Sequence, residues 1–172
     1  MTKSSLFLFS LLTLTLFSAC KKDRSVSGFD AELFEKAQRK DGFVFYNLST
    51  EYLNTPKQAG HKSIYLRTKY NDLASSILNE NGGIIDGINF PDGSLIVNEM
   101  YTIKGEPDKY AVLFKDPKND YADQNGWVWS YFNADKTIIE PTSRKGTSCI
   151  ACHSKGNNYM LMPNYFEVKK VK

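Results

Sequence analysis

The chain has 172 residues and a formal net charge of +3, with 41% hydrophobic and 24% charged residues. This length suits one globular domain with its own core, and so small a net charge gives no basis for nucleic-acid binding. The cysteines are Cys20, Cys149 and Cys152, too few and too unevenly spaced to predict a disulfide framework.

The first 19 residues have the pattern of a signal peptide. Lys3 precedes an apolar run over residues 6–17, and two small residues stand before Cys20. The ending Phe-Ser-Ala-Cys resembles a bacterial lipoprotein signal, which predicts a lipidated Cys20 and a tether over residues 20–28. The alternatives are ordinary cleavage with a free Cys20, or an uncleaved anchor, for which the run is short of the roughly 20 residues a span needs. We expect a domain anchored to a bacterial membrane in the cell envelope, facing the periplasm or the cell surface.

The first half of the domain predicts two short helices and two strands. Asp30 can cap a helix over residues 31–40, whose apolar residues form one stripe. Residues 43–48 are rich in aromatic side chains and predict a strand. Residues 61–70 alternate with a period of two and predict another, which a helix over residues 72–78 follows.

The second half predicts an antiparallel meander. Three strand patterns, over residues 94–102, 110–114 and 127–132, are each preceded by turn residues. Nothing repeats at a fixed period, so residues 29–172 are expected to form one domain. The predicted fold class is α+β, an antiparallel β-sheet flanked by a few short helices.

The most informative motif is Cys-Ile-Ala-Cys-His at residues 149–153, near the C-terminus. Its spacing lets two thiols attach to the vinyl groups of one haem, with the next histidine under the iron. We therefore expect one covalent haem c per chain, held by Cys149, Cys152 and His153, with His153 as the iron ligand. The alternatives are a redox Cys-x-x-Cys pair and half of a zinc site. A redox pair is expected early in a βαβ unit, and zinc would need two further ligands when His61 is the only other histidine.

Two further stretches accompany the motif. They are Asn-Phe-Pro-Asp-Gly-Ser-Leu-Ile-Val-Asn-Glu at residues 89–99 and Gly-Trp-Val-Trp-Ser-Tyr-Phe at residues 126–132. With the haem motif, this combination resembles the cytochrome P-460 family and its relative cytochrome c-prime-beta, over about residues 29–168. The resemblance implies an antiparallel sheet flanked by helices, a homodimer, and a five-coordinate haem that is open on its distal side.

The resemblance also implies two branches of function. One branch oxidises hydroxylamine, and a lysine bonded to the porphyrin and a distal carboxylate mark it; the other binds nitric oxide or carbon monoxide in an apolar, aromatic pocket. Glu99 is the candidate carboxylate, because it shares a strand face with apolar residues that would raise its pKa; the alternative is a solvated strand residue. Lys62 is the candidate cross-linking lysine, with Lys69 in the other strand phase.

Three functions therefore compete. The first is hydroxylamine oxidation, with electrons leaving through the haem to a redox partner protein. The second is capture of nitric oxide or a similar small nitrogenous ligand without turnover. The third is electron transfer by an iron that Met160 or Met162 caps. In all three the membrane is contacted through the lipid anchor.

Overall fold

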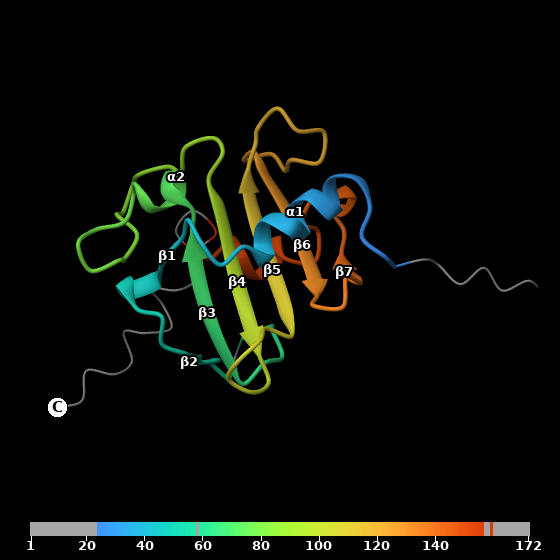
Figure 1. Cartoon of the computed structure of the whole chain (residues 1–172). Helices are drawn as coiled ribbons and strands as arrows, with labels where there is room; N and C mark the ends of the chain where they lie inside the picture. The colour runs from blue at the N-terminus through green and yellow to red at the C-terminus, as the bar shows by residue number, and fades with distance from the viewer. Residues whose placement is uncertain (1–23, 58, 157–158, 160–172) are drawn as a thin grey trace, which may run out of the picture.

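The computed structural model describes residues 24–57, 59–156 and 159. The expected signal peptide, Cys20, Met160 and Met162 lie outside these residues. The centre of the domain is one seven-stranded antiparallel sheet in the order β1-β3-β4-β5-β6-β7, with β2 also paired to β3 (Figure 1). The sheet with its short helices confirms the predicted α+β class. No described helix has the length and apolar character needed to cross a membrane.

The elements are short apart from the central strands and the first helix. The strands are β1 Val44–Phe45, β2 Leu53–Asn54, β3 Tyr65–Tyr70, β4 Leu95–Tyr101, β5 Lys109–Lys115, β6 Trp127–Asn133 and β7 Ile138–Glu140. The α-helices are α1 Gly28–Gln38, α2 Asp72–Ser75 and α3 Ile150–His153, and the 3-10 helices are η1 Tyr46–Leu48 and η2 Thr142–Arg144.

The predicted meander is confirmed in β4, β5 and β6. Ile96 pairs with Leu113, and Leu113 pairs with Trp129, so these side chains share one face of the sheet. We call this the motif face, because the Cys-x-x-Cys-His segment packs against it. Val97 and its neighbours in phase point to the other side, which α1 covers, and we call that side the helix face.

The helix face is closed by α1, which lies over β5 and β6 (Figure 1). The side chains of Leu33, Phe34 and Ala37 are fully buried, as the apolar stripe predicts. Asp30 was expected to cap this helix, but the N-cap position is Ser27. Asp30 Oδ1 instead accepts hydrogen bonds of 3.0 Å from Ser130 Oγ and from the backbone N–H of Thr142. The acidic side chain thus joins α1 to η2, the segment that leads to the motif.

Five elements differ from the sequence-based prediction. The strand expected over residues 43–48 ends after β1, because Asn47 and Leu48 have left-handed φ angles of 53° and 52° and the chain turns into η1. The strand expected over residues 61–70 begins only at Tyr65. Helix α2 stops after one turn. Strands β2 and β7 were not predicted, since each is too short to show a period.

The described end of the expected tether belongs to the folded domain. The backbone N–H of Val26 donates to the Lys136 carbonyl at 3.1 Å, and that of Ile138 donates to the Arg24 carbonyl at 2.7 Å. Val26 also packs against the core of the helix face. The chain from Arg24 onward therefore follows β7 before α1 begins.

Candidate haem-binding site

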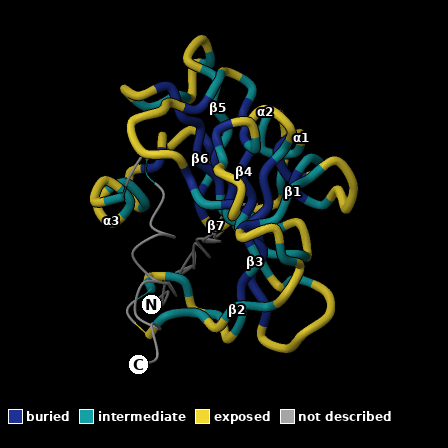
Figure 2. Tube along the Cα trace, turned by 90° about the vertical axis from the view of Figure 1, so that its left-hand side faces the viewer, coloured by how far each residue is buried: buried dark blue, intermediate teal, exposed yellow. Residues whose placement is uncertain are grey.

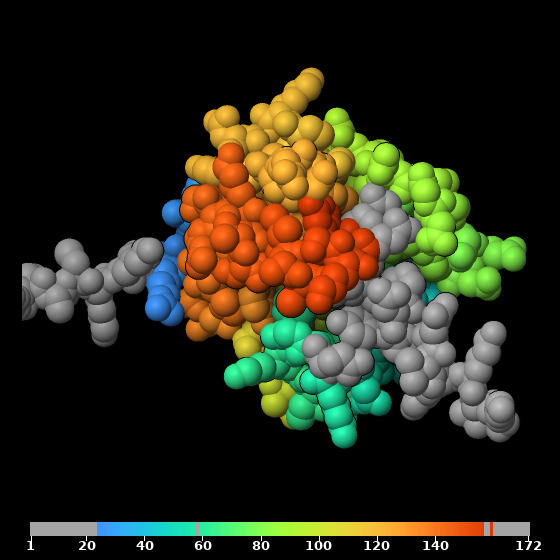
Figure 3. All heavy atoms as spheres, turned by 180° about the vertical axis from the view of Figure 1, so that it is seen from behind, coloured from blue at the N-terminus to red at the C-terminus, as the bar shows by residue number. Residues whose placement is uncertain are grey.

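The motif occupies one helical turn on the side of the sheet opposite α1. In the view from behind, the segment around residues 140–156 lies across the middle of this side (Figure 3). The backbone N–H groups of Cys152 and His153 both bond to the Cys149 carbonyl, at 3.2 and 3.1 Å. Cys149 is half-buried against the core of the motif face, and Cys152 is exposed on α3, which stands out from the sheet (Figure 2). Residues three apart on a helical turn lie on one side of it, so both thiols are available to one ligand.

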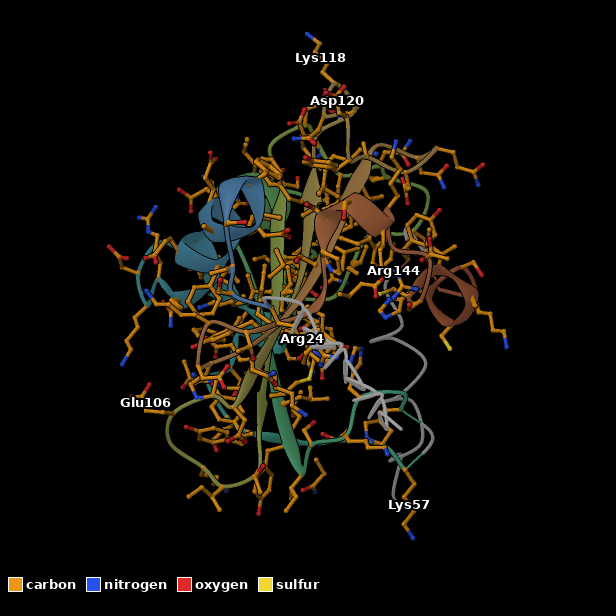
Figure 4. All side chains as sticks on the ribbon, turned by 90° about the vertical axis from the view of Figure 1, so that its right-hand side faces the viewer. Arg24, Lys57, Glu106, Lys118, Asp120 and Arg144 are labelled. Atoms are coloured by element: carbon orange, nitrogen blue, oxygen red, sulfur yellow. The ribbon has the colours of Figure 1, made fainter. Side chains whose placement is uncertain are left out.

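A buried carboxylate fixes the entry to this turn. Glu140, at the end of β7, accepts a hydrogen bond from Ser148 Oγ at 3.1 Å and pairs with Arg144 Nη1 at 3.3 Å. Figure 4 shows Arg144 beside α3. Lys145 and Gly146 follow with left-handed φ angles of 50° and 70°, which turn the chain toward Cys149. The position of the motif is therefore set by side chains that precede it.

Trp129 is the platform on which the motif rests. Its indole N–H donates to Asp123 Oδ2 at 2.9 Å, which fixes the ring. The ring centre lies 5.4 Å from that of His153 and 5.2 Å from that of Tyr159, both in edge-to-face geometry. A Cβ atom added to Gly146 would lie 2.5 Å from Trp129 Cγ, so only glycine fits at that position. The backbone before the motif and the ring of its histidine thus meet one indole.

His153 is prepared to bind a metal through Nε2. Its Nδ1 lies 2.8 Å from the Tyr159 carbonyl oxygen. A carbonyl only accepts, so Nδ1 carries the hydrogen and the lone pair of the neutral ring is on Nε2. Burial lowers the pKa of His153 and outweighs the hydrogen bond to Tyr159, which raises it. The ring is therefore neutral at neutral pH. A neutral imidazole with its second nitrogen anchored is the usual proximal ligand of haem iron.

The rest of the donor set also fits a haem. Burial, reinforced by the charge of Glu140, raises the pKa of Cys149 to about 11, so this residue is a protonated thiol at neutral pH. Among the described residues, no three histidine, cysteine or acidic side chains are grouped as a structural zinc ion would need. Asn98 Oδ1 and Tyr70 Oη are buried on the motif face without a hydrogen-bond partner among the described residues. Buried polar atoms normally have hydrogen-bond partners, so these two atoms are available to a group bound at the motif face.

Glu99 lies away from the motif. It alternates with Asn98 along β4 and so points to the helix face, where its carboxylate is fully engaged. Glu99 Oε1 lies 2.7 Å from Lys69 Nζ. Glu99 Oε2 accepts from Arg67 Nη2 at 2.8 Å and from the Tyr101 hydroxyl at 2.6 Å. The expected burial of Glu99 is observed, but we assign its carboxylate to this charge network and not to a site beside His153.

The two candidate lysines do not meet the motif either. Lys62 is exposed, in the loop before β3. Lys69 is 1% exposed, and besides Glu99 it donates to the Arg39 carbonyl at 2.6 Å, on the helix face. The structure thus brings together Cys149, Cys152 and His153, and places the other sequence-based candidates elsewhere.

The sequence analysis did not identify three residues that lie around the motif: Trp129, Glu140 and His61. Trp129 was visible only as one of many aromatic residues, and Glu140 as one of many acids. His61 had a signal, since it is the second of two histidines in the chain. Its ring centre lies 6.1 Å from that of His153 and 5.4 Å from that of Tyr131. Burial, and then the charges of His153 and Lys109, lower the pKa of His61 to about 4.

The sheet carries two thiols and a neutral imidazole on one turn, which are the groups that attachment of a haem requires. Searches of curated proteins and of solved structures gave no significant match. The family model described as Cytochrome P460 matches residues 41–159, which is more than half of the chain. The chain therefore belongs to the Cytochrome P460 family and is a haem cytochrome, which confirms the resemblance found in the sequence.

Replacing Gly146 by alanine should destabilise the domain. The new Cβ would collide with the Trp129 ring, and the left-handed φ of 70° is strained for alanine. We expect the free energy of unfolding to fall by about 2 kcal/mol or more in a urea titration. Gly60→Ala is the control, because nothing lies within 4 Å of the added atom there. Equal stability of the two variants would contradict the platform role of Trp129.

Replacing Glu99 by glutamine should leave Lys69 as a buried charge without its counter-ion. We expect a loss of about 3 to 5 kcal/mol in the free energy of unfolding at neutral pH. Glu106→Gln, in the exposed pair with Lys40, should change stability little. Haem attachment should be unaffected in both variants, because these residues do not face the motif. Unchanged stability of Glu99→Gln with impaired haem chemistry would instead support the distal role.

The same pair gives a pH dependence. Burial raises the pKa of Glu99, but the hydrogen bonds from Lys69, Tyr101 and Arg67 outweigh it and hold the value below the ordinary 4.5. The stabilisation is therefore complete above pH 4.5 and is lost as the pH falls through the folded-state value. Glu99→Gln should lack this component of the acid transition.

Proposed function

We propose that this protein is a mono-haem c-type cytochrome that binds nitric oxide or a similar small nitrogenous ligand. The haem would be attached through Cys149 and Cys152, with His153 as its iron ligand. The observation that carries the proposal is the anchored imidazole: the Tyr159 carbonyl fixes Nδ1, so the lone pair of Nε2 is available beside two thiols on one turn. When bound, the haem supplies a redox-active iron with a position for a small ligand.

The surroundings of the motif support binding over turnover. Aromatic rings lie around the motif histidine: Trp129 and His61 contact His153, and Tyr131 contacts His61. The carboxylate and the lysines expected of a hydroxylamine-oxidising relative point elsewhere or are exposed. In this setting the protein's own residues hold the haem, orient the imidazole and exclude water with aromatic surface.

Hydroxylamine oxidation is the second candidate, and Lys109 favours it. This lysine lies on the motif face of β5, and its charge acts on His61. A lysine near the haem edge is the mark that the catalytic branch of the family implies. In this case electrons would pass from hydroxylamine through the haem to a redox partner protein.

The two candidates are separated by spectra and by turnover of the holoprotein. We expect haem staining to persist on a denaturing gel, the ferrous protein to bind nitric oxide, and its Soret band to lie where an unmodified c-type haem absorbs. Added hydroxylamine with an electron acceptor should not be consumed. A red-shifted Soret band together with turnover would establish the second candidate.

The double variant Cys149→Ser, Cys152→Ser is the control for attachment, because it removes both thioether bonds while leaving His153 in place. It should lose the haem stain. A wild-type chain that carries no covalent haem, after expression with a c-type maturation system, would overturn the proposed function in either form.

We further propose that the protein is exported and anchored through a lipid on Cys20, on the membrane surface of the bacterial envelope, where it meets its ligand and any redox partner. The signal pattern supports this placement, and the folded domain begins soon afterward, by Arg24. Cys20→Ser should abolish lipid labelling and membrane sedimentation but keep the haem stain. A wild-type protein without lipid would remove the anchor from the proposal.

A further inference from the structure

The buried polar atoms that lack a hydrogen-bond partner belong to one face of the sheet. Among the side chains that the structure describes, these atoms are Tyr70 Oη, Ser94 Oγ and Asn98 Oδ1. Ser94 directly precedes β4 and Asn98 lies within it, both in phase with Ile96, with which Tyr70 pairs. Because Ile96 packs in the core of the motif face, all three side chains are on that face. The unsatisfied atoms are thus on the side of the sheet that carries the Cys-x-x-Cys-His segment.

Asn98 differs from the other two because it is partly exposed. Tyr70 and Ser94 are fully buried. Asn98 pairs across the sheet with Ala111, which pairs with Tyr131, and all three residues of this row are partly exposed. The last torsion of an asparagine side chain has a broad distribution, so rotation of the carboxamide brings its buried oxygen to the exposed side. A group bound over the motif face therefore has access to the amide of Asn98.

The row of Asn98 lies beside the motif histidine. Trp129, which contacts His153, is two residues from Tyr131 on the same face of β6. Tyr131 in turn contacts His61, whose ring centre lies 6.1 Å from that of His153. Neighbouring strands are about 4.8 Å apart and residues in phase about 7 Å apart, so the Cα atoms of Asn98 and Trp129 are separated by roughly 12 Å. Side chains of both rows can thus contact one group of the size of a haem and its ligand.

The chemistry of the unsatisfied atom indicates the kind of partner that it lacks. The Tyr131 hydroxyl in the same row already donates to Met100 Sδ, at 3.4 Å. Asn98 Oδ1 has no such bond, and a buried amide oxygen without a partner costs free energy. An amide oxygen only accepts, so its partner must carry an N–H or O–H hydrogen, which an ionised haem carboxylate does not. A small ligand with such a hydrogen supplies it.

We propose that Asn98 is a specificity-determining residue, which accepts a hydrogen bond from small ligands at the haem that carry an N–H or O–H hydrogen. The inference rests on the proposed haem attachment and deepens the proposed ligand binding. It leaves the distal side of the iron open, as the family resemblance implies. Ligands without such a hydrogen leave the Asn98 oxygen unsatisfied and gain nothing from it. Selection then depends on the protons of the ligand as well as on the iron.

The test titrates ferric wild-type holoprotein and Asn98→Leu with two ligands, in the absence of an electron acceptor, and follows the Soret band. Hydroxylamine carries N–H and O–H hydrogens, whereas azide carries none at neutral pH. In the variant the Kd of hydroxylamine should rise about three- to tenfold, because one hydrogen bond is lost. The Kd of azide should be unchanged.

Stability without added ligand is the second measurement on the same variant. Leucine replaces an unsatisfied amide by an apolar group of similar volume, so Asn98→Leu holoprotein should unfold at the same urea concentration as wild type or at a higher one. A lower midpoint would show that the carboxamide is bonded within the protein, and it would overturn the inference.

Ile96→Leu is the matched control, since it exchanges one apolar side chain for another on the same face of the same strand. It should keep both wild-type Kd values. An unchanged hydroxylamine Kd in Asn98→Leu, or equal weakening of both ligands, would overturn the inference while leaving haem attachment intact. Loss of the haem stain from the wild-type protein would instead be a failure of the proposed function, so the two failures are distinguishable.

Discussion

The packing of one indole ring organises the functional side of this protein. Trp129 is held by its strand and by the hydrogen bond to Asp123, and it touches the turn before the motif, the motif histidine and Tyr159. Because the ring is buried and cannot shift, the contacts around it are set together. The orientation of His153 therefore follows from the interior of the sheet, although α3 itself is short and largely exposed.

The meander and the haem motif could be predicted because each is encoded by residues that are close in sequence. Alternation with a period of two identified β4, β5 and β6, and the spacing of Cys149, Cys152 and His153 needed no knowledge of the fold. The ends of elements were harder to predict. Leu48 is an ordinary strand residue, whereas Asn47 tolerates a left-handed conformation. Both left-handed conformations occur where Gly82 approaches the backbone of η1.

The site around the motif depended on information that one sequence does not contain. Strand phase placed Glu99 with Leu95 and Val97, and the structure agrees. Strand phase could not show which face of the sheet α1 covers and which face the motif packs against. In the structure Glu99 lies on the face that α1 covers, away from the motif. The contact between His61 and His153 is likewise tertiary, since it needs β3 and β6 to be arranged in one sheet with two strands between them.

The division of the sheet into two faces has a consequence for how this domain can change. The buried charges of Lys69 and Glu99 and the apolar contacts of α1 act on the helix face, whereas Cys149 and the two imidazoles pack against the motif face. Effects of substitutions that share no partners tend to add. The chemistry of the motif face can therefore be altered by successive substitutions without drawing on the stability that the helix face supplies, so the architecture allows related chains to diverge in reactivity while keeping one scaffold.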